Sequence, residues 1–323
     1  MSTEHSLTIS YGKLRVPVYR VYASPLTGIA AIPESQFTGR ENILFAYEVD
    51  VEVLGDNFLP AYTHGDNSNV VATDSMKNFV LRQGLDFEGS TLEEYLNMLG
   101  HNFLTTYPQM QSLRLGGREI PFANVPVPQS DAPHFSASNV LFSRSHSDYT
   151  TAVLEFERQE GSGDPVLTSH TCGRMNMELF KVTGSAFSRF VRDEYTTLQE
   201  RFDRPLFIYL DVYWKYNDAQ ALLSPDHVSY VPAEQVRDLI QVVFSEFVSE
   251  SIQHLVHEMG KRLLSRFPQL AEISFEAQNR TRDLVVASSK EERVKVYSDP
   301  FSAYGIIKLS FKPTKVSNPL NGN

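Results

Sequence analysis

The sequence predicts an α+β fold made of two copies of one module, and three observations support this prediction. Strand-like segments, in which apolar residues alternate with polar ones, flank helix-like segments in each half of the chain. Two short motifs recur in the same order about 160 residues apart. The length of 323 residues also exceeds what one hydrophobic core usually holds, so two domains are expected.

The first half contains several predicted strands. Residues 7–23 are rich in valine and tyrosine, and residues 45–53 alternate as a half-buried strand does. Residues 110–120 and 149–157 have the composition of further strands. The segment 126–134 is polar and contains proline, so it is predicted to be a loop.

Two helices are predicted between these strands. Residues 73–83 have a helical pattern, which Gly84 is expected to end. Ser90 and Thr91, followed by Glu93 and Glu94, have the pattern of a capping box, in which two side chains satisfy the free N–H groups of a helix start. Apolar residues then recur at helical spacing as far as Pro108.

The second half repeats this order. Gly-Ser-Gly-Asp-Pro at residues 161–165 is typical of a domain boundary, so we predict one domain over residues 7–160 and another over residues 166–313. A long helical pattern follows Pro232. The polar residues 314–323 are expected to be disordered.

Two motif echoes indicate a tandem duplication. Leu-Phe-Ala-Tyr at residues 44–47 is echoed by Leu-Phe-Ile-Tyr at residues 206–209. Tyr-Pro-Gln-Met at residues 107–110 is echoed by Phe-Pro-Gln-Leu at residues 267–270. Chance could explain either echo alone, but both together favour duplication. Each half then contains strand, strand, helix, helix, strand, strand, a module that forms a small antiparallel sheet with helices on one face.

The composition excludes several classes of protein. A formal net charge of −10 argues against sequence-independent binding of nucleic acid, which needs a basic surface. The chain shows no apolar run that could cross a bilayer, no signal peptide and no peroxisomal signal, so a cytoplasmic protein without membrane contact is expected. The single cysteine, Cys172, excludes an internal disulfide and a cysteine-rich zinc site.

Residues 62–78 form the segment around which a site is expected. A polar loop rich in Gly, Asp, Asn and Ser leads to Thr73 and Asp74, which open a helical pattern. Local rules describe this segment as a loop and a helix N-cap. A helix start also presents unpaired N–H groups to an anion, and Thr73 adds a hydroxyl that can donate and accept. The local pattern leaves both interpretations open.

Motifs along nearly the whole chain resemble those of urate oxidase (uricase), particularly the bacterial type. Their number and their order make this signal highly specific. They are Tyr-Gly-Lys at 11–13, Pro-Leu-Thr-Gly at 25–28, Ile-Pro-Glu-Ser at 32–35, Gly-Asp-Asn-Ser at 65–68, Val-Ala-Thr-Asp-Ser-Met-Lys-Asn at 71–78, Phe-Val-Arg-Asp-Glu-Tyr-Thr-Thr-Leu at 190–198, Ser-Ile-Gln-His at 251–254 and Gln-Asn-Arg-Thr at 278–281.

The resemblance implies a fold, an assembly and a reaction. The fold would be the tunnelling fold (T-fold), with two modules per chain, each an antiparallel four-stranded sheet with two helices on one face. The implied homotetramer closes its sheets into a barrel and has its active sites at subunit interfaces. The implied reaction, in purine degradation, is oxidation of urate by O2 and water to 5-hydroxyisourate and hydrogen peroxide, without a metal or an organic cofactor.

The resemblance also assigns a proton relay. Lys13 matches the family's catalytic lysine, and Thr73 matches its partner. A neutral lysine could take a proton from urate through the Thr73 hydroxyl, which would leave an electron-rich anion able to reduce O2. The backbone N–H groups of Asp74 and Ile252 are expected to contact the substrate. Without the resemblance, Lys13 would be interpreted as a surface lysine on an edge strand.

Three further side chains match the residues that hold urate. Phe187 matches the aromatic that stacks on the purine. Arg204 matches an arginine that clamps one edge, because a planar guanidinium pairs with an anionic edge through two bonds. Gln253 matches the opposite clamp, an amide that donates and accepts. Taken singly, they also fit a core phenylalanine, an arginine in a salt bridge with Asp203 or Asp211, and an exposed helix position.

The last matching motif contains two departures from relatives. Asn279 matches the residue that holds O2 or the attacking water above the urate plane. Fungal and animal relatives have histidine where this chain has Thr281, so a relay of lysine, threonine and histidine is incomplete, and Thr281 could instead order a water. Bacterial relatives commonly have tryptophan where this chain has Arg282.

Two other functions compete with this interpretation. Several pterin and purine enzymes with the same fold need zinc held by His and Cys ligands. His254 and His257 are three residues apart on a predicted helix, but the sequence offers no persuasive third ligand. A non-catalytic oligomeric scaffold is the second alternative, since fold alone never excludes it. The joint presence of Lys13, Thr73, Arg204, Gln253 and Asn279 argues against a scaffold.

Overall fold

The computed structural model describes residues 6–129, 132–144, 146–300 and 302–312. The chain divides into two compact units. The first comprises Met1–Ile32, Gln36–Gly173 and Ala219–Pro232, and the second comprises Pro33–Ser35, Arg174–Asp218 and Ala233–Asn323. The chain passes from the first unit to the second within β7 (Pro165–Lys181), after the boundary expected at residues 161–165. The domain bounds 7–160 and 166–313 stay a prediction. The predicted tail, 314–323, lies outside the described residues.

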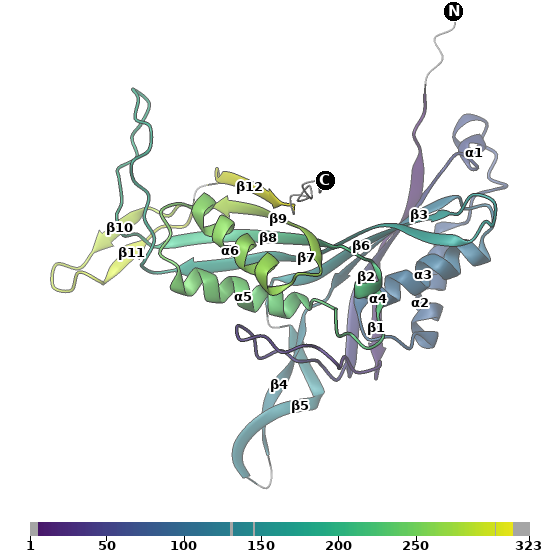
Figure 1. Cartoon of the computed structure of the whole chain (residues 1–323), viewed down its shortest axis with the longest axis horizontal. Coiled ribbons are helices and arrows are strands. Elements are labelled where there is room, and N and C mark those ends of the chain that lie inside the picture. The colour runs from purple at the N-terminus through teal and green to yellow at the C-terminus, as the bar shows by residue number, and fades with distance from the viewer. Residues whose placement is uncertain (1–5, 130–131, 145, 301, 313–323) are drawn as a thin grey trace, which may run out of the picture. The chain divides into compact units, whose positions relative to one another are not determined.

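The first unit has the expected order of elements, with a short helix and a hairpin added. Its main strands lie in the order β1-β2-β3-β6 and pair antiparallel, and α2 and α3 lie together against one face of this sheet (Figure 1). In chain order its elements are β1 (Ser10–Val21), β2 (Leu44–Leu54), α1 (Leu59–Thr63), α2 (Thr73–Asp86), α3 (Leu92–Thr106), β3 (Ser112–Glu119), β4 (Phe122–Gln129), β5 (Ala132–Arg144) and β6 (Tyr149–Arg158).

The second unit repeats this plan. Its strands lie in the order β7-β8-β9-β12, with α5 and α6 against one face (Figure 1). A hairpin again separates the last two strands of the module, as β4 and β5 do in the first unit. After β7 the elements are β8 (Leu206–Tyr216), α4 (Gln220–Leu223), α5 (Ala233–Glu246), α6 (Ile252–Arg266), β9 (Leu270–Asn279), β10 (Leu284–Ala287), β11 (Lys295–Tyr297) and β12 (Gly305–Phe311), with α4 itself assigned to the first unit.

Local chemistry explains why the helices begin where they do. The Thr91 hydroxyl accepts from the N–H of Glu94, and the Glu94 carboxylate accepts from the N–H of Thr91, which confirms the predicted capping box. At the start of α6, the Ser251 hydroxyl accepts from the N–H of His254. Both helices then bury one apolar face against the sheet, as their spacing predicts.

Two sequence-based expectations were wrong. Residues 126–134 are not simply a loop, because their described part lies in the strands β4 and β5, where Pro126 pairs with Ala137 and Pro128 with Phe135. Gly84 does not end α2, which continues to Asp86. A Cβ at Gly84 would lie 3.3 Å from the Tyr95 hydroxyl on α3, so this glycine allows close helix packing.

The sequence offset between equivalent residues of the two units differs by one position from the offset of one motif echo. In each unit an aspartate accepts from the N–H of a strand residue at positive φ: Asp50 from Arg15 at 2.5 Å, and Asp211 from Asn176 at 2.6 Å. These pairs are 161 positions apart. The echo of residues 44–47 in 206–209 is 162 positions apart, and a slip of one residue exchanges the two faces of a strand.

Within the part of the chain that the structure describes, no helix is long and apolar enough to cross a membrane.

Candidate active site

Lys13 lies on β1 immediately before a break in strand register. Lys13 pairs with Val51 of β2, and the register shifts before Val16. Arg15, inside this bulge, has a φ of 58° and is held by the Asp50 carboxylate. A bulge turns the neighbouring side chains away from the regular alternation, so it fixes the direction of the half-buried Lys13.

Thr73 is the first residue of α2, and no side chain caps this helix start. The N-cap residue is Ala72, which has no side-chain acceptor for the free N–H groups of the first turn. The Asp74 carboxylate binds within its own helix, to Lys77 Nζ at 2.5 Å and to Asn78 Nδ2 at 3.0 Å. The Thr73 hydroxyl and the first-turn N–H groups therefore stand at the helix end where an anion is favoured.

Tyr11 connects these two elements. Its hydroxyl accepts from the N–H of Val71 at 3.0 Å, so β1 is tied to the segment that leads into α2. Its ring packs edge-on against Phe58, with centroids 4.7 Å apart. Burial raises the pKa of Tyr11, so the phenol stays protonated at neutral pH. The pKa of Asp74 is lowered, mainly by the hydrogen bond from Lys77. The charge of Lys13 makes a smaller contribution to the same shift.

In the second unit, Phe187 and Arg204 lie side by side. The backbone of Phe187 exchanges two hydrogen bonds with that of Arg201, at 2.7 and 2.9 Å. The N–H of Arg204 donates to the Ser185 carbonyl at 2.8 Å. The Arg204 guanidinium carbon consequently lies 5.4 Å from the centroid of the Phe187 ring, a cation–π distance. Phe190 stacks on the same ring, with centroids 5.0 Å apart.

Three buried polar atoms beside this pair have no hydrogen-bond partner among the described residues. They are Arg204 Nε, Ser185 Oγ and Ser249 Oγ. Burial lowers the pKa of Arg204. Asp203 and Asp211, the possible salt-bridge partners, bind elsewhere: Asp203 accepts from Thr183 and Gly184, and Asp211 from the N–H of Asn176. Such a group of unpaired donors needs an acceptor, because buried polar groups are normally hydrogen-bonded.

Gln253 and Ile252 open α6 near this pair. Ser249, two residues before the N-cap, is bridged to Ser185, and its carbonyl accepts from the N–H of Ala186 at 2.8 Å. This bridge ties the start of α6 to the segment that carries Phe187. Gln253, the second residue of the helix, is exposed.

Asn279 ends β9 in the same unit. It pairs with Ile208 of β8, which begins two residues after Arg204, so Asn279 and Arg204 belong to the same end of the sheet. Thr281 is exposed beyond the strand. Arg282 has a contact of its own, since its guanidinium carbon lies 4.6 Å from the centroid of the Phe207 ring.

The structure therefore groups the predicted residues by unit. Lys13, Thr73 and Asp74 belong to the first unit, whereas Phe187, Arg204, Ile252, Gln253 and Asn279 belong to the second. Sequence reasoning missed Tyr11 as a connecting residue and the serines at 185 and 249. For Ser185 the available signal was a small polar residue two positions before the matched Phe187, whereas Ser249 is brought to Ser185 only by the fold.

In the described ranges, no three His, Cys, Asp or Glu side chains gather closely enough to hold a metal ion. The two histidines considered as zinc ligands contact aromatic rings instead. His254 packs edge-on against Phe247, with centroids 4.7 Å apart, and His257 lies 5.4 Å from Phe311.

Comparison with known proteins decides the family. The Uricase family model matches residues 10–147 and 170–308. The chain belongs to the uricase family. It is 48% identical to the uricase of Haloferax volcanii over 273 residues, which are 84% of this chain and 88% of that protein. It is also 44% identical over 304 residues to the uric acid degradation bifunctional protein PucL of Bacillus subtilis. This match covers 94% of the present chain and 60% of PucL.

Solved uricase structures have the same fold. The crystal structure of urate oxidase from Bacillus sp. TB-90 matches with a TM-score of 0.91 and 42% identity, over 94% of this chain and 100% of that chain. A uricase from Bacillus fastidious matches with a TM-score of 0.91 and 38% identity, over 95% of this chain and 94% of that chain. The predicted α+β fold of two tandem T-fold modules is confirmed.

Proposed function

We propose that the chain oxidises urate with O2 and water to 5-hydroxyisourate and hydrogen peroxide, without a metal or an organic cofactor. Two electrons leave urate and reduce O2 to peroxide, and water supplies the added hydroxyl. Membership of the uricase family supports this reaction. The observation that carries the proposal is the Arg204 guanidinium beside the Phe187 ring, with buried donors that lack partners among the described residues. A flat anion would satisfy both the ring and the donors.

Phe187, Arg204 and Gln253 would hold the purine. Phe187 stacks on the flat ring system, and Arg204 donates to one anionic edge. Gln253 donates to and accepts from the opposite edge, together with the N–H of Ile252. Burial lowers the pKa of Arg204, but a guanidinium stays protonated in proteins, so Arg204 remains a cation.

Lys13 and Thr73 would move the proton. Lys13 accepts a proton through the Thr73 hydroxyl, and the N–H of Asp74 stabilises the urate anion at the start of α2. The uncapped N-cap, Ala72, supports this role because it leaves these N–H groups to a ligand. Asn279 would hold O2 or the attacking water, and Thr281 would order a water in place of the histidine that other relatives have.

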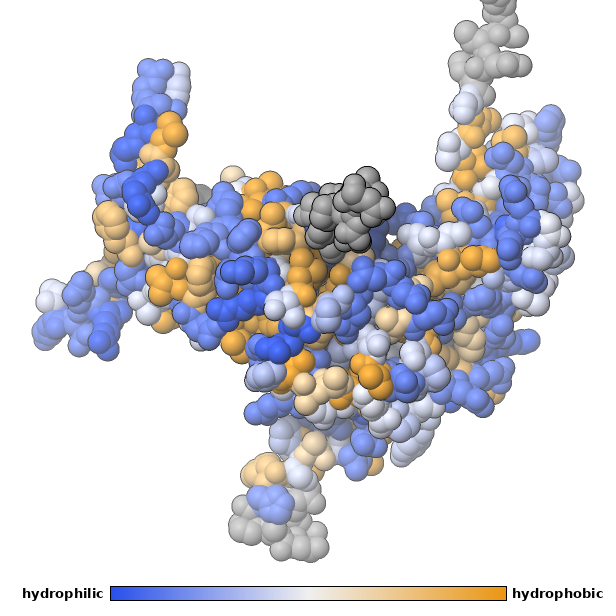
Figure 2. All heavy atoms as spheres, in the orientation of Figure 1, coloured by the Kyte–Doolittle hydropathy of each residue, from blue (hydrophilic) through white to orange (hydrophobic). Residues whose placement is uncertain are grey.

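The two groups would meet across subunits of a homotetramer whose sheets close into a barrel. Edge strand β1 supports this assembly, since its free edge could pair with another subunit and it exposes three large apolar side chains: Leu14 is 64% exposed, Tyr19 59% and Val21 64%. Figure 2 shows apolar surface among hydrophilic side chains on the face in view. We propose that Lys13 and Thr73 of one subunit face Phe187, Arg204, Gln253 and Asn279 of its neighbour.

The test is the loss of the ultraviolet absorbance of urate together with peroxide formation, in metal-free buffer containing a chelator. The wild-type protein should turn over there, and Arg204→Gln should lose about 10²- to 10³-fold in kcat/KM, because the half-buried cation proposed to pair with the substrate is removed. Arg201→Gln is the matched control, since Arg201 lies three positions before Arg204, its side chain is exposed, and its hydrogen bonds to Phe187 are made by the backbone, which the substitution keeps. Persistence of urate with the wild-type protein would refute the proposal.

A further inference from the structure

The two units match each other residue by residue around the start of the second helix in each module. Leu26 exchanges backbone hydrogen bonds with Arg40, as Phe187 does with Arg201, and the pairs are 161 positions apart. The N-caps of α3 and α6, Thr91 and Ser251, are 160 positions apart. Leu26 is thus the counterpart of Phe187, and Glu93, the second residue of α3, is the counterpart of Gln253.

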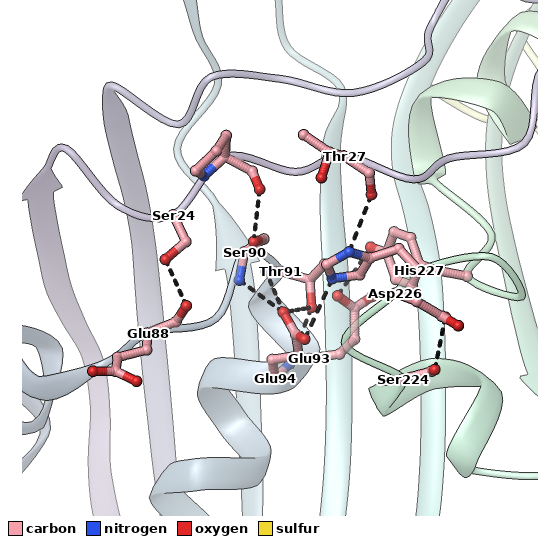
Figure 3. Close-up of polar contacts among 12 residues, drawn as sticks. Ser24, Thr27, Glu88, Ser90, Thr91, Glu93, Glu94, Ser224, Asp226 and His227 are labelled. Atoms are coloured by element: carbon pink, nitrogen blue, oxygen red, sulfur yellow. Dashed lines mark hydrogen bonds and ion pairs between the residues drawn. The ribbon is translucent and has the colours of Figure 1, made fainter.

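We call the paired segment together with the start of the second helix the frame of each unit. In the first unit the frame is covered by a segment from later in the chain, residues 219–232, which we call the strap. The strap belongs to the first unit and lies over the start of α3 (Figure 3). Its Tyr230 hydroxyl donates to Glu93 Oε2 at 3.1 Å. His227 Nδ1 lies 3.2 Å from the Thr27 carbonyl, so it donates there when protonated (Figure 3). The strap therefore binds both the helix start and the loop that carries Leu26.

The strap also faces the second acidic residue of this helix. His227 Nε2 lies 3.3 Å from Glu94 Oε1, an ion pair when the imidazole is protonated, without the alignment of a hydrogen bond (Figure 3). Cys172 of β7 hydrogen-bonds the Glu93 carboxyl from the sheet side. Glu93 thus meets Tyr230 from the strap and Cys172 from the sheet, with Glu94 beside it on its own helix.

The two frames differ in how deeply they are buried. Leu26 and Glu93 are each 1% exposed, and His227 and Tyr230 are 5% and 7% exposed. In the second unit Phe187 is half-buried and Gln253 is exposed. The same frame is therefore closed in the first unit and reachable in the second.

A glycine marks the close approach of the strap. Gly28 has a φ of +80°, and a Cβ built on it would lie 2.1 Å from the Asp226 carbonyl oxygen. The position 161 residues later is Arg189, which has a φ of 58° and carries a full side chain. The backbone conformation is retained in both units, but only the strap side requires a residue without Cβ.

We infer that the first unit contains a second copy of the ring-binding frame, which the chain fills with its own Tyr230 and His227. Glu93 stands where Gln253 stands in the second unit, and when it is ionised its carboxylate only accepts hydrogen bonds. The frame would therefore take a planar aromatic ring with an O–H or N–H donor, and it would repel the urate anion. The inference rests on the proposed function in one respect, the identification of Phe187 and Gln253 as the open frame.

The test removes the internal ring and supplies an external one. Tyr230→Gly should unfold at a lower temperature than the wild type, and 10 mM phenol should raise its Tm by about 3 °C, saturably, because a ligand that binds only the folded state stabilises it. Toluene, which lacks the donor, should give less. Tyr230→Phe, which keeps the ring, should show no phenol effect, and neither should the wild type.

The result that overturns the inference is a folded Tyr230→Gly protein with no phenol-dependent shift, or a shift that Glu93→Leu leaves unchanged in that background. If Tyr230→Gly does not fold, Tyr230→Phe decides. Loss of the donor to Glu93 should lower the Tm more at pH 8 than at pH 6, and equal losses would overturn the inference. These readouts need no turnover, so failure to oxidise urate would refute the proposed function without touching them.

Discussion

The first and second units share one backbone frame and differ in what occupies it. In the first, the strap buries Leu26 and Glu93, while in the second Phe187 and Gln253 stay reachable. The counterpart of Arg204, 161 positions earlier, is the uncharged Ile43. The first unit therefore lacks the cation that an anionic substrate needs at this position.

The difference shows how a duplicated module can specialise without changing its fold. Backbone features are retained in both copies, such as the positive φ of Arg15 and of Asn176, whose N–H groups donate to aspartates. Single side chains then decide which copy can bind an anion. Function here depends on a few exchanged groups, because the scaffold is common to both units.

Lys13→Ala tests the largest expected effect, which is the contribution of the first unit to the rate of urate oxidation. Urate oxidation should slow by about 10²- to 10⁴-fold, because general base catalysis contributes that much. The proposed homotetramer should be as stable in this variant as in the wild type, which analytical ultracentrifugation measures. Lys215→Ala, at an exposed position of β8, is the control and should keep full activity. A Lys13→Ala enzyme within threefold of the wild type would remove Lys13 from the mechanism.

Gln253→Glu makes the open frame resemble the closed one. The KM for urate should rise by about 10²-fold at pH 8, because the carboxylate repels the anion and loses the N–H donor. The rise should shrink as the pH falls and the new carboxyl protonates. Glu93→Gln, the reciprocal exchange in the first unit, should leave the KM unchanged. Equal effects of the two exchanges would contradict the distinction between the units.

Glu93→Gln should instead change the pH dependence of stability. Burial raises the pKa of Glu93 from 4.5 to about 7. The folded state thus binds the proton more tightly than the unfolded state, and stability is full below pH 4.5 and falls as the pH rises through 7. The wild type should lose on the order of 3 kcal/mol of unfolding free energy over this range.

Urea unfolding at pH 5 and pH 8.5 measures this loss. Glu93→Gln should lack it, whereas Glu41→Gln, at an exposed position, should keep it. Parallel pH profiles for the wild type and Glu93→Gln would show that the strap does not hold a titrating carboxyl.

Gly28→Ala tests the approach of the strap with the smallest change. Gly65 has a similar φ of +70° but no atom within 4 Å of a built Cβ, so Gly65→Ala measures backbone strain alone, about 1 kcal/mol. Gly28→Ala should cost about 2 kcal/mol more, because its Cβ would displace the Asp226 carbonyl. Thermal unfolding of the two variants gives the difference, and equal losses would argue against a tightly packed strap.

The elements that follow from local rules were predicted well. The capping box of Thr91 and Glu94 needs only neighbouring residues, and the order of strands and helices follows from periodicity. The hairpin of β4 and β5 does not follow from the sequence pattern, because Pro126 and Pro128 are typical of loops, although a two-stranded ribbon tolerates proline on its unpaired side. The motif echo at residues 206–209 was one residue out of register for a related reason, since letters alone do not show which face of a strand is buried.

The candidate site was predictable only through the family resemblance. Nothing local distinguishes Lys13 from a surface lysine or Gln253 from an exposed helix residue. The buried hydroxyls of Ser185 and Ser249, and the ring of Tyr230 on Glu93, depend on contacts between segments far apart in sequence. Tertiary contacts of this kind leave no periodic signal.

The most direct measurement of the shared site mixes two inactive proteins. Lys13→Ala chains keep the proposed clamp of the second unit, and Arg204→Ala chains keep the proposed base of the first unit. After subunit exchange in equal amounts, random pairing should restore about a quarter of wild-type urate oxidation, because one site in four would combine two intact halves. No recovery in verified heterotetramers would contradict a site built from two subunits.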